Sequence, residues 1–212
     1  RITDGKLDAS SNEHALCTDV YKVNKTGMKE YEPCFTLRGY SAVEISSEKG
    51  SAAVEKIEGY AVHADLPQTG EFCCDNAELN RLHAVILRTQ SSALMSYPID
   101  CPQRDERLGW TGDAQIFSGA SLFSRNCAAF WEKFMFDLRC EQEKNADGHV
   151  PVTVPTFVGK GDHATMNAGL AGWGDAAAII PWNLYLHTGD LAQLRRQYPA
   201  MLDWCRYIRS CD

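Results

Sequence analysis

The sequence predicts a mainly α protein whose first third is built from short β-strands. Two observations support this prediction. The spacing of apolar residues changes near residue 70 from simple alternation to helical periodicity, and the later segments begin and end with helix-capping residues. The chain of 212 residues, 44% of them hydrophobic, is long and apolar enough to bury a sizeable core.

Before residue 70, apolar and polar residues alternate in three segments, 16–23, 42–45 and 53–62, with Gly, Ser and Asn between them. Alternation with period two, enriched in β-branched residues, predicts antiparallel strands. These strands are too few for a complete sandwich, so we expect the end of one. Residues 65–70, which include a proline and a glycine, are predicted to be a linker.

Five helices are predicted beyond this point, over about 75–97, 113–124, 126–146, 174–188 and from 190 onward, with a long irregular connection over 148–172. Asp75 and Glu78 predict a capping box at the start of the first helix. Gly189 is expected to end the fourth helix and Asp190 to cap the fifth. Pro199 is expected to break or restart the fifth helix.

The most distinctive segment is the loop from Asp100 to Asp113, which holds four acids and two arginines together with Trp110. Pro102 and two glycines disfavour a regular helix through it. Charges beside apolar segments cost free energy unless they are paired or used. Carboxylates grouped with arginines and an indole suit a sugar-cleaving site, where one acid donates a proton and others hold hydroxyl groups.

The run DCPQRDERLGWTGDAQ, residues 100–115, resembles the signature of the bacterial α-L-rhamnosidases of glycoside hydrolase family 78. Segments 30–40, 63–70 and 171–175 resemble stretches that follow the same order in that family. The resemblance implies that residues 67–212 are the N-terminal part of an (α/α)6-barrel catalytic domain. It also implies that residues 1–66 are the C-terminal part of a β-sandwich domain. The barrel would be partial, because only about half of its helices are predicted here.

Glu106 occupies the position of the proton donor in the family motif, so the resemblance implies that it is the general acid. The alternative is a solvated loop glutamate. Asp100, Arg104 and Asp113 match positions that hold sugar hydroxyls and orient the acid. For these three residues the alternative is a structural network of ion pairs, for example between Asp100 and Arg104.

Trp110 and Trp173 are candidate walls of the sugar site, since an indole face can cover the methyl group and the apolar side of a 6-deoxy sugar. Burial in the protein core is the alternative for both. Trp131, Trp182 and Trp204 lie on helical patterns and are expected to be core residues.

Charge and composition exclude several classes of function. The net charge of −7 and the absence of a long basic cluster argue against a nucleic-acid partner, and no apolar run is long enough to span a membrane. No pattern of Cys and His has metal-ligand spacing, and no phosphate loop is present, so neither a metal nor a cofactor is predicted. The nine cysteines are expected to be small buried residues in a reducing compartment, which favours the cytoplasm, although a disulfide framework is the alternative.

The resulting hypothesis is hydrolysis, with inversion, of terminal α-L-rhamnose from a rhamnose-containing glycoside or oligosaccharide. In the family the general base is a glutamate on a much later helix, and no position of this sequence matches it. Residues 1–212 alone are therefore expected to be an inactive fragment. Two alternatives stay open: another inverting (α/α)6-barrel glycosidase, and a noncatalytic carbohydrate-binding or interaction module.

Overall fold

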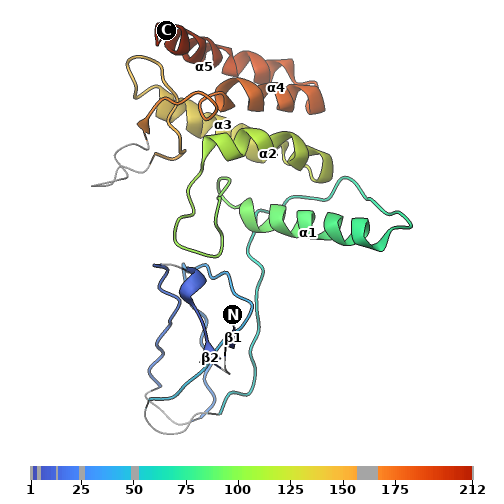
Figure 1. The fold of residues 1–212 in the computed structure, drawn as a ribbon, viewed down its shortest axis with the longest axis vertical. Helices are drawn as coiled ribbons and strands as arrows, with labels where there is room; N and C mark the ends of the chain where they lie inside the picture. Colours follow the sequence, from blue (N-terminus) through green and yellow to red (C-terminus); the bar gives the residue numbers. More distant parts are fainter. Residues whose placement is uncertain are drawn as a thin grey trace. The chain divides into compact units, whose positions relative to one another are not determined.

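Figure 1 shows the fold in a computed structural model, which describes residues 2–3, 6–12, 14–23, 27–48, 53–156 and 167–211. The chain divides into two compact units. Unit 1 comprises Arg1–Val62 and the loop tip Cys101–Arg107, and unit 2 comprises His63–Asp100 and Leu108–Asp212. The acidic loop is thus divided between the two units.

Unit 1 has little regular secondary structure in its described residues. Strands β1 (Ile2–Thr3) and β2 (Lys6–Leu7) form an antiparallel pair, followed by the 3-10 helix η1 (Ser10–Asn12). The strands predicted over 16–23, 42–45 and 53–62 are not formed in these described segments, and their apolar residues are largely exposed. The reason is that a strand gains stability only from neighbouring strands and from a covered apolar face, and alternation along the chain supplies neither.

Unit 2 is helical and confirms the prediction of a mainly α protein. Its described residues form five α-helices: α1 (Ala77–Ala93), α2 (Thr111–Ser124), α3 (Ala128–Gln142), α4 (Ala176–Thr188) and α5 (Leu191–Ser210). Helix α4 packs against α2, α3 and α5, and α3 also packs against α5. All five predicted helices are present, with ends that differ from the prediction by a few residues.

The cap of α1 is Asn76, one residue after the predicted Asp75. The Asn76 Oδ1 accepts hydrogen bonds from the backbone N–H groups of Glu78 at 2.9 Å and Leu79 at 3.3 Å. Asn and Asp are about equally good caps, so residue type could not separate the two positions. The extended backbone of Asn76, with φ −92° and ψ 109°, decides in its favour.

The caps of α4 and α5 are the predicted ones. Gly189 ends α4 in the left-handed conformation, with φ 70°, and the Asp190 carboxylate accepts a 2.9 Å hydrogen bond from the N–H of Gln193. The break predicted at Pro199 is wrong, because α5 runs through it. Residues on both sides of this proline, among them Gln193 and Trp204, are buried, so packing holds the two halves in one helix.

The core of unit 2 contains Trp131 and Phe134 of α3, Leu184 of α4 and Trp204 of α5, all of them buried. The core positions predicted for Trp131 and Trp204 are confirmed. The same prediction is wrong for Trp182, whose side chain is about half exposed. Helix α4 is apolar on nearly every side, so periodicity alone could not identify its buried face.

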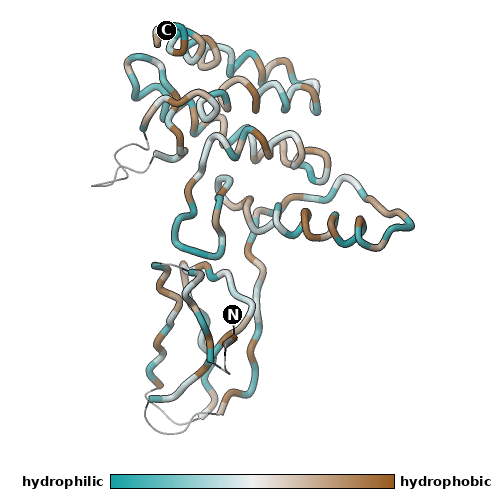
Figure 2. The backbone as a smooth tube through the Cα atoms, in the orientation of Figure 1, coloured by the Kyte–Doolittle hydropathy of each residue, from teal (hydrophilic) through white to brown (hydrophobic). Residues whose placement is uncertain are grey.

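Apolar side chains also lie on the surface of α1. Leu79, Leu82, Val85 and Ile86 are each about half exposed, and Figure 2 shows the apolar positions of this helix in brown. No helix in the described part of the chain has the length and apolar character needed to cross a membrane. Helices α2 to α5 pack against one another, whereas α1 makes no such extensive contact with any of them. The four apolar residues of α1 thus form a helix face without a partner in the described part of unit 2 (Figure 2).

The predicted linker 65–70 packs against the helices of unit 2. The carbonyl of Leu66 accepts a 2.9 Å hydrogen bond from Arg125 Nη1, and the carbonyl of Pro67 accepts one of 2.9 Å from the N–H of Asn126. The segment predicted as a linker thus follows the boundary between the two units and is held to the helices of unit 2 by hydrogen bonds.

All nine cysteines lie in the described part of the chain, where none is in a disulfide, and Cys127 is the one fully buried among them. Burial raises the pKa of the Cys127 thiol, against smaller opposing effects of its hydrogen bonds with Gln90 and Ser121. The expectation of small buried residues holds for this cysteine. It is wrong for the exposed ones, which are Cys17, Cys34, Cys73, Cys205 and Cys211.

Candidate active site

The base of the acidic loop is closed within unit 2. The N–H of Leu108 donates a 2.9 Å hydrogen bond to Asp100 Oδ1, and the N–H of Asp100 donates one of 3.3 Å to the Leu108 carbonyl. Asp100 thus joins the two ends of the loop through its backbone and its side chain. Asp100, which is a candidate residue for binding the sugar, thus uses one carboxylate oxygen to hold the loop together.

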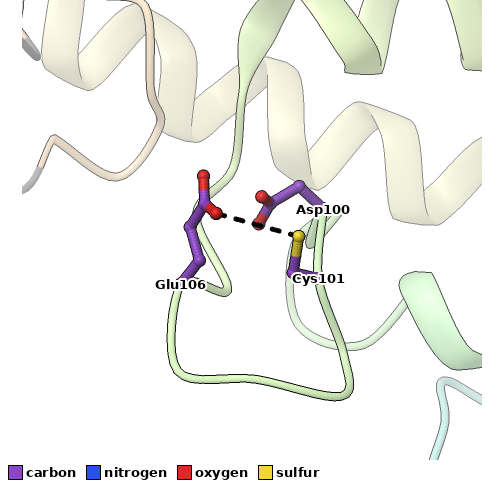
Figure 3. Close-up of side chains that lie close together, drawn as sticks. All are labelled: Asp100, Cys101 and Glu106. Carbon is purple, nitrogen blue, oxygen red and sulfur yellow. Dashed lines mark hydrogen bonds between the residues drawn. The ribbon is translucent and has the colours of Figure 1, made fainter. Parts of the chain in front are cut away.

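The tip of the loop, in unit 1, holds the predicted general acid. Glu106 Oε2 accepts a hydrogen bond from Arg104 Nη2 in an ion pair, and the Cys101 thiol lies 3.8 Å from the same oxygen (Figure 3). The Arg104 and Glu106 side chains are 25% and 30% exposed. The Glu106 carboxylate is therefore oriented by two neighbours while it stays accessible.

Arg107 holds the tip in an uncommon backbone conformation. Its φ of 43° lies in the left-handed region that favours glycine, and its Nη2 donates to the carbonyls of Leu37 at 2.7 Å and Pro102 at 3.1 Å. Close packing at Gly39 adds to this anchor, because a Cβ there would lie 2.4 Å from the Gln103 Cα. Segment 30–40, which resembles the family in sequence, thus contacts the loop tip that carries Glu106.

The second half of the loop leads into α2 and pairs with residues 153–154. The N–H of Val154 donates a 2.8 Å hydrogen bond to the Gly109 carbonyl, and Trp110 forms a β-bridge with Thr153. A Cβ at Gly109 would lie only 2.0 Å from the Val154 carbonyl oxygen, so this approach requires glycine. The pairing fixes Trp110 immediately before the first turn of α2.

Trp173 lies against the same turn, although it is distant in sequence. A Cβ at Gly112 would lie 3.1 Å from Cδ1 and Nε1 of the indole, so the ring packs directly over this glycine. Gln115, one turn further along α2, donates a hydrogen bond from Nε2 to the carbonyl of Gly172. The Trp173 side chain stays 39% exposed, as a wall that contacts a ligand would be.

Asp175 fixes the turn that carries Trp173. Its Oδ2 accepts a 3.0 Å hydrogen bond from the N–H of Gly172, and its Oδ1 accepts one of 2.9 Å from the buried Trp204 Nε1. Sequence reasoning noted segment 171–175 but gave no role to Asp175. The two glycines beside Asp175 were the sequence signal of a tightly packed turn. Gly172 has a φ of 85°, and a Cβ at Gly174 would lie 2.3 Å from Trp204.

Asp113, in the first turn of α2, has a perturbed carboxyl group. Partial desolvation of the carboxyl group raises its pKa above the ordinary value, although the residue as a whole is exposed, and the nearby charge of Asp100 raises the pKa further. Perturbed carboxylates are common at functional sites. Within unit 2, the first turn of α2 therefore brings together Trp110, Asp113 and Trp173, with Asp100 close enough to affect the titration of Asp113.

Asp100, Cys101 and Glu106 carry the kinds of oxygen and sulfur atoms that bind metal ions (Figure 3). The Glu106 oxygen nearest Cys101 already accepts from the Arg104 guanidinium. A second cation at this oxygen would be repelled by that guanidinium. The arrangement favours hydrogen bonding over metal binding at this oxygen of Glu106.

Comparison with known proteins identifies the family. Residues 67–212 match the family model described as the bacterial alpha-L-rhamnosidase 6 hairpin glycosidase domain. An alpha-L-rhamnosidase of Alteromonas sp. (strain LOR) is 40% identical over 208 residues, which are 97% of this chain and 22% of that protein. One from Streptomyces avermitilis is 35% identical over 207 residues, which are 98% of this chain and 19% of that protein. The chain thus spans about a fifth of the length of these relatives.

Solved structures agree with this result. The Streptomyces avermitilis alpha-L-rhamnosidase complexed with L-rhamnose has a TM-score of 0.63 and 38% identity, over 70% of this chain and 14% of that one. The alpha-L-rhamnosidase from Dictyoglumus thermophilum also has a TM-score of 0.63, with 32% identity, over 70% of this chain and 16% of that one. The helical fold, the acidic loop and the family match over most of its length lead to one conclusion: this chain belongs to the bacterial α-L-rhamnosidase family of glycoside hydrolases.

Proposed function

We propose that the protein containing this chain hydrolyses terminal, non-reducing α-L-rhamnose from glycosides or oligosaccharides with inversion of configuration. The observation that carries the proposal is the oriented, partly exposed Glu106 carboxylate within the motif of a chain that belongs to this family. The L-rhamnose bound in the Streptomyces avermitilis relative supports the choice of sugar.

In the proposed mechanism Glu106 protonates the leaving glycosidic oxygen. A second carboxylate activates a water molecule on the opposite face of the sugar, at a separation of roughly 6.5–9.5 Å from the acid that leaves room for this water. The family resemblance implies that this base is a glutamate on a later helix, outside residues 1–212. The role of this chain is to donate the proton and to hold the sugar.

The sugar would be held by side chains of the acidic loop and of the Trp173 turn. Asp100, Arg104 and Asp113 would bind hydroxyl groups, and Trp110 and Trp173 would cover the methyl group and the apolar face of the ring. The indole of Trp173 is partly exposed and packs on Gly112, which supports its role as a surface that contacts the sugar.

The proposal includes the domain context. Residues 67–212 would be the N-terminal part of an (α/α)6 barrel, and residues 1–66 the C-terminal part of a β-sandwich domain. The half-exposed apolar face of α1 supports the barrel, because large contiguous apolar surfaces of stable proteins are usually covered. The alternating, exposed segments of unit 1 would gain partners in a complete sandwich.

The central test is Glu106→Gln in the intact protein. The amide keeps the shape of the side chain but has no transferable proton, so hydrolysis of a rhamnoside with a poor leaving group should fall by about 10²–10⁴-fold. An activated aryl rhamnoside, which needs less protonation, should be affected less. Glu143→Gln, at an exposed glutamate outside the loop, is the matched control. If Glu106→Gln turned over substrate as fast as the control, Glu106 would not be the general acid.

Two further measurements test the sugar and the stereochemistry. Among nitrophenyl rhamnoside, glucoside, fucoside and mannoside, only the rhamnoside should be cleaved efficiently; preference for another sugar would favour the alternative glycosidase. Proton NMR of the first product should show the β anomer of rhamnose, and initial release of the α anomer would contradict inversion. Sugar binding without any cleavage would favour the noncatalytic module.

A further inference from the structure

His149, in the segment of unit 2 that follows α3, forms a short hydrogen bond at each of its two ring nitrogens. Its Nδ1 lies 2.6 Å from Asp147 Oδ1, and its Nε2 lies 2.6 Å from the carbonyl oxygen of Asn167. The side chain is only 16% exposed. The imidazole thus joins two segments that are 18 residues apart in the chain.

The two partners of His149 determine its protonation state. A backbone carbonyl oxygen and an ionised carboxylate can only accept hydrogen bonds. Asp147 is ionised at neutral pH, because the side-chain hydrogen bond with His149 holds the pKa of its carboxyl group below the ordinary value of 3.8. A neutral imidazole has a single N–H and could donate to only one of the two acceptors. Both bonds therefore require protons on both nitrogens, which makes His149 an imidazolium in this arrangement.

The neighbouring groups on α5 are compatible with this charge. Tyr207 packs against the imidazole of His149 with 5.6 Å between ring centroids, and a hydrogen bond with Cys211 raises the pKa of Tyr207 above its ordinary value. Tyr207 is therefore uncharged between about pH 5 and 8, where histidine usually titrates. Asp203 faces Gly148, where a Cβ would lie 3.1 Å from the Asp203 Cβ, and a negative charge there favours an imidazolium. Residues 167–170 have no titratable side chain.

The bond from His149 is part of a clamp on residues 167–169. Asn167 Nδ2 donates a 3.1 Å hydrogen bond to Asn145 Oδ1, and the Tyr207 hydroxyl donates one of 3.1 Å to the Gly169 carbonyl. Gly169 packs closely against the histidine, because a Cβ there would lie 2.6 Å from the His149 Cβ. Two backbone carbonyls are thus held in place, and the bond to the first of them depends on the charge of His149.

The clamped residues lead directly into the turn that carries Trp173. The carbonyl of Leu170 accepts hydrogen bonds from the N–H groups of Trp173 at 3.2 Å and Gly174 at 2.9 Å. Leu170 follows Gly169, whose carbonyl belongs to the clamp. Loss of the bond to Asn167 therefore loosens the segment from which this turn begins.

We propose that His149 is a positioning residue for Trp173 and that it acts as an imidazolium. Its two N–H groups bind Asp147 and the Asn167 carbonyl at the same time, which holds the Trp173 turn in place for sugar binding. When the imidazolium releases a proton to water as the pH rises, one of the two bonds is lost and the turn loosens. The effect on sugar binding rests on the proposed function of Trp173 as a wall of the site, whereas the effect on the turn does not.

The effect on the turn is tested by hydrogen exchange in the intact protein at about pH 6, where histidine is largely charged. In His149→Gln, which has no positive charge, the N–H groups of Trp173 and Gly174 should exchange about 3- to 10-fold faster, as expected for the loss of one hydrogen bond. His187→Gln is the matched control. His187 is an exposed histidine of α4 whose Nδ1 lies 2.9 Å from the Asn183 carbonyl oxygen. Unchanged exchange at Trp173 in His149→Gln would overturn the proposal.

The effect on sugar binding is tested by calorimetry with L-rhamnose at about pH 5.5 and about pH 8.5, on either side of the usual titration of histidine. The dissociation constant of the unmodified protein and of His187→Gln should rise by about 3- to 10-fold at the higher pH. His149→Gln should bind with the weaker affinity at both pH values, a result that a merely structural histidine would not give. The same pH dependence in His149→Gln as in the control would overturn the proposal. If L-rhamnose bound to none of these proteins, the proposed function would fail, and the exchange at Trp173 would still decide the role of His149.

Discussion

Asp175→Ala should destabilise the protein and loosen the turn that carries Trp173. The carboxylate of Asp175 links this turn to the core, because it accepts from the N–H of Gly172 at 3.0 Å and from Trp204 Nε1 at 2.9 Å. Alanine removes both acceptors. The free-energy cost of losing the acceptor differs between the two donors, because Gly172 is exposed and Trp204 is only 2% exposed.

The magnitude follows from that difference. Water can replace Asp175 at the exposed Gly172 N–H, so this part costs about 0.5–1.5 kcal/mol. The indole N–H of Trp204 would be left buried without an acceptor, which costs about 1–3 kcal/mol. The free energy of unfolding should therefore fall by about 2–4 kcal/mol, a large part of a typical domain stability of about 5–15 kcal/mol. Asp175→Asn keeps one carbonyl oxygen for Trp204 and should lose less.

The assay is urea denaturation of the intact protein, combined with a double-mutant cycle. Trp204→Phe removes the indole donor, so Asp175→Ala should cost about 1–3 kcal/mol less in that background. Asp203→Ala is the control, because its ion pair with Arg206 lies at the surface and should contribute at most about 1 kcal/mol. The KM for an aryl rhamnoside should also rise in Asp175→Ala. A coupling energy near zero would refute the proposed link between the turn and the core.

Three further predictions concern the loop and the chain as a whole. Asp113→Asn should stabilise the protein at pH 7: the raised pKa of Asp113 gives a stability contribution that is full below its ordinary value of 3.8 and is lost as the pH rises through the folded-state pKa. The gain, measured by denaturation against pH, should vanish in acid, and a pH-independent difference would contradict it. Arg107→Ala and Arg107→Gly should both lower kcat/KM, by up to about 10²-fold, since both lose the anchors to Leu37 and Pro102. The glycine variant should be the more stable by about 1 kcal/mol because it tolerates the φ of 43°, and equal stability would argue against backbone strain. Residues 1–212 expressed alone should be inactive and self-associate through the exposed α1 face, whereas a monodisperse, active monomer in light scattering and rhamnosidase assays would contradict the proposed division of the catalytic machinery.

The sequence by itself determined the features that depend on local interactions. Helical periodicity and capping chemistry predicted five helices, the left-handed end at Gly189 and the cap at Asp190. These features depend on residues within a few positions of each other, so a linear pattern contains the necessary information. The acidic loop motif likewise identified the family, because it is a long, contiguous run of specific residues.

Tertiary structure alone decided what depends on distant partners. The predicted strands of unit 1 needed neighbours that alternation cannot provide, and α5 continues through Pro199 because the residues on both sides of it are buried against other helices. The packing of Trp173 on Gly112 and the hydrogen bond from Trp204 to Asp175 join segments far apart in the chain. No local pattern encodes such contacts, since they form only when separate helices bury their surfaces against one another.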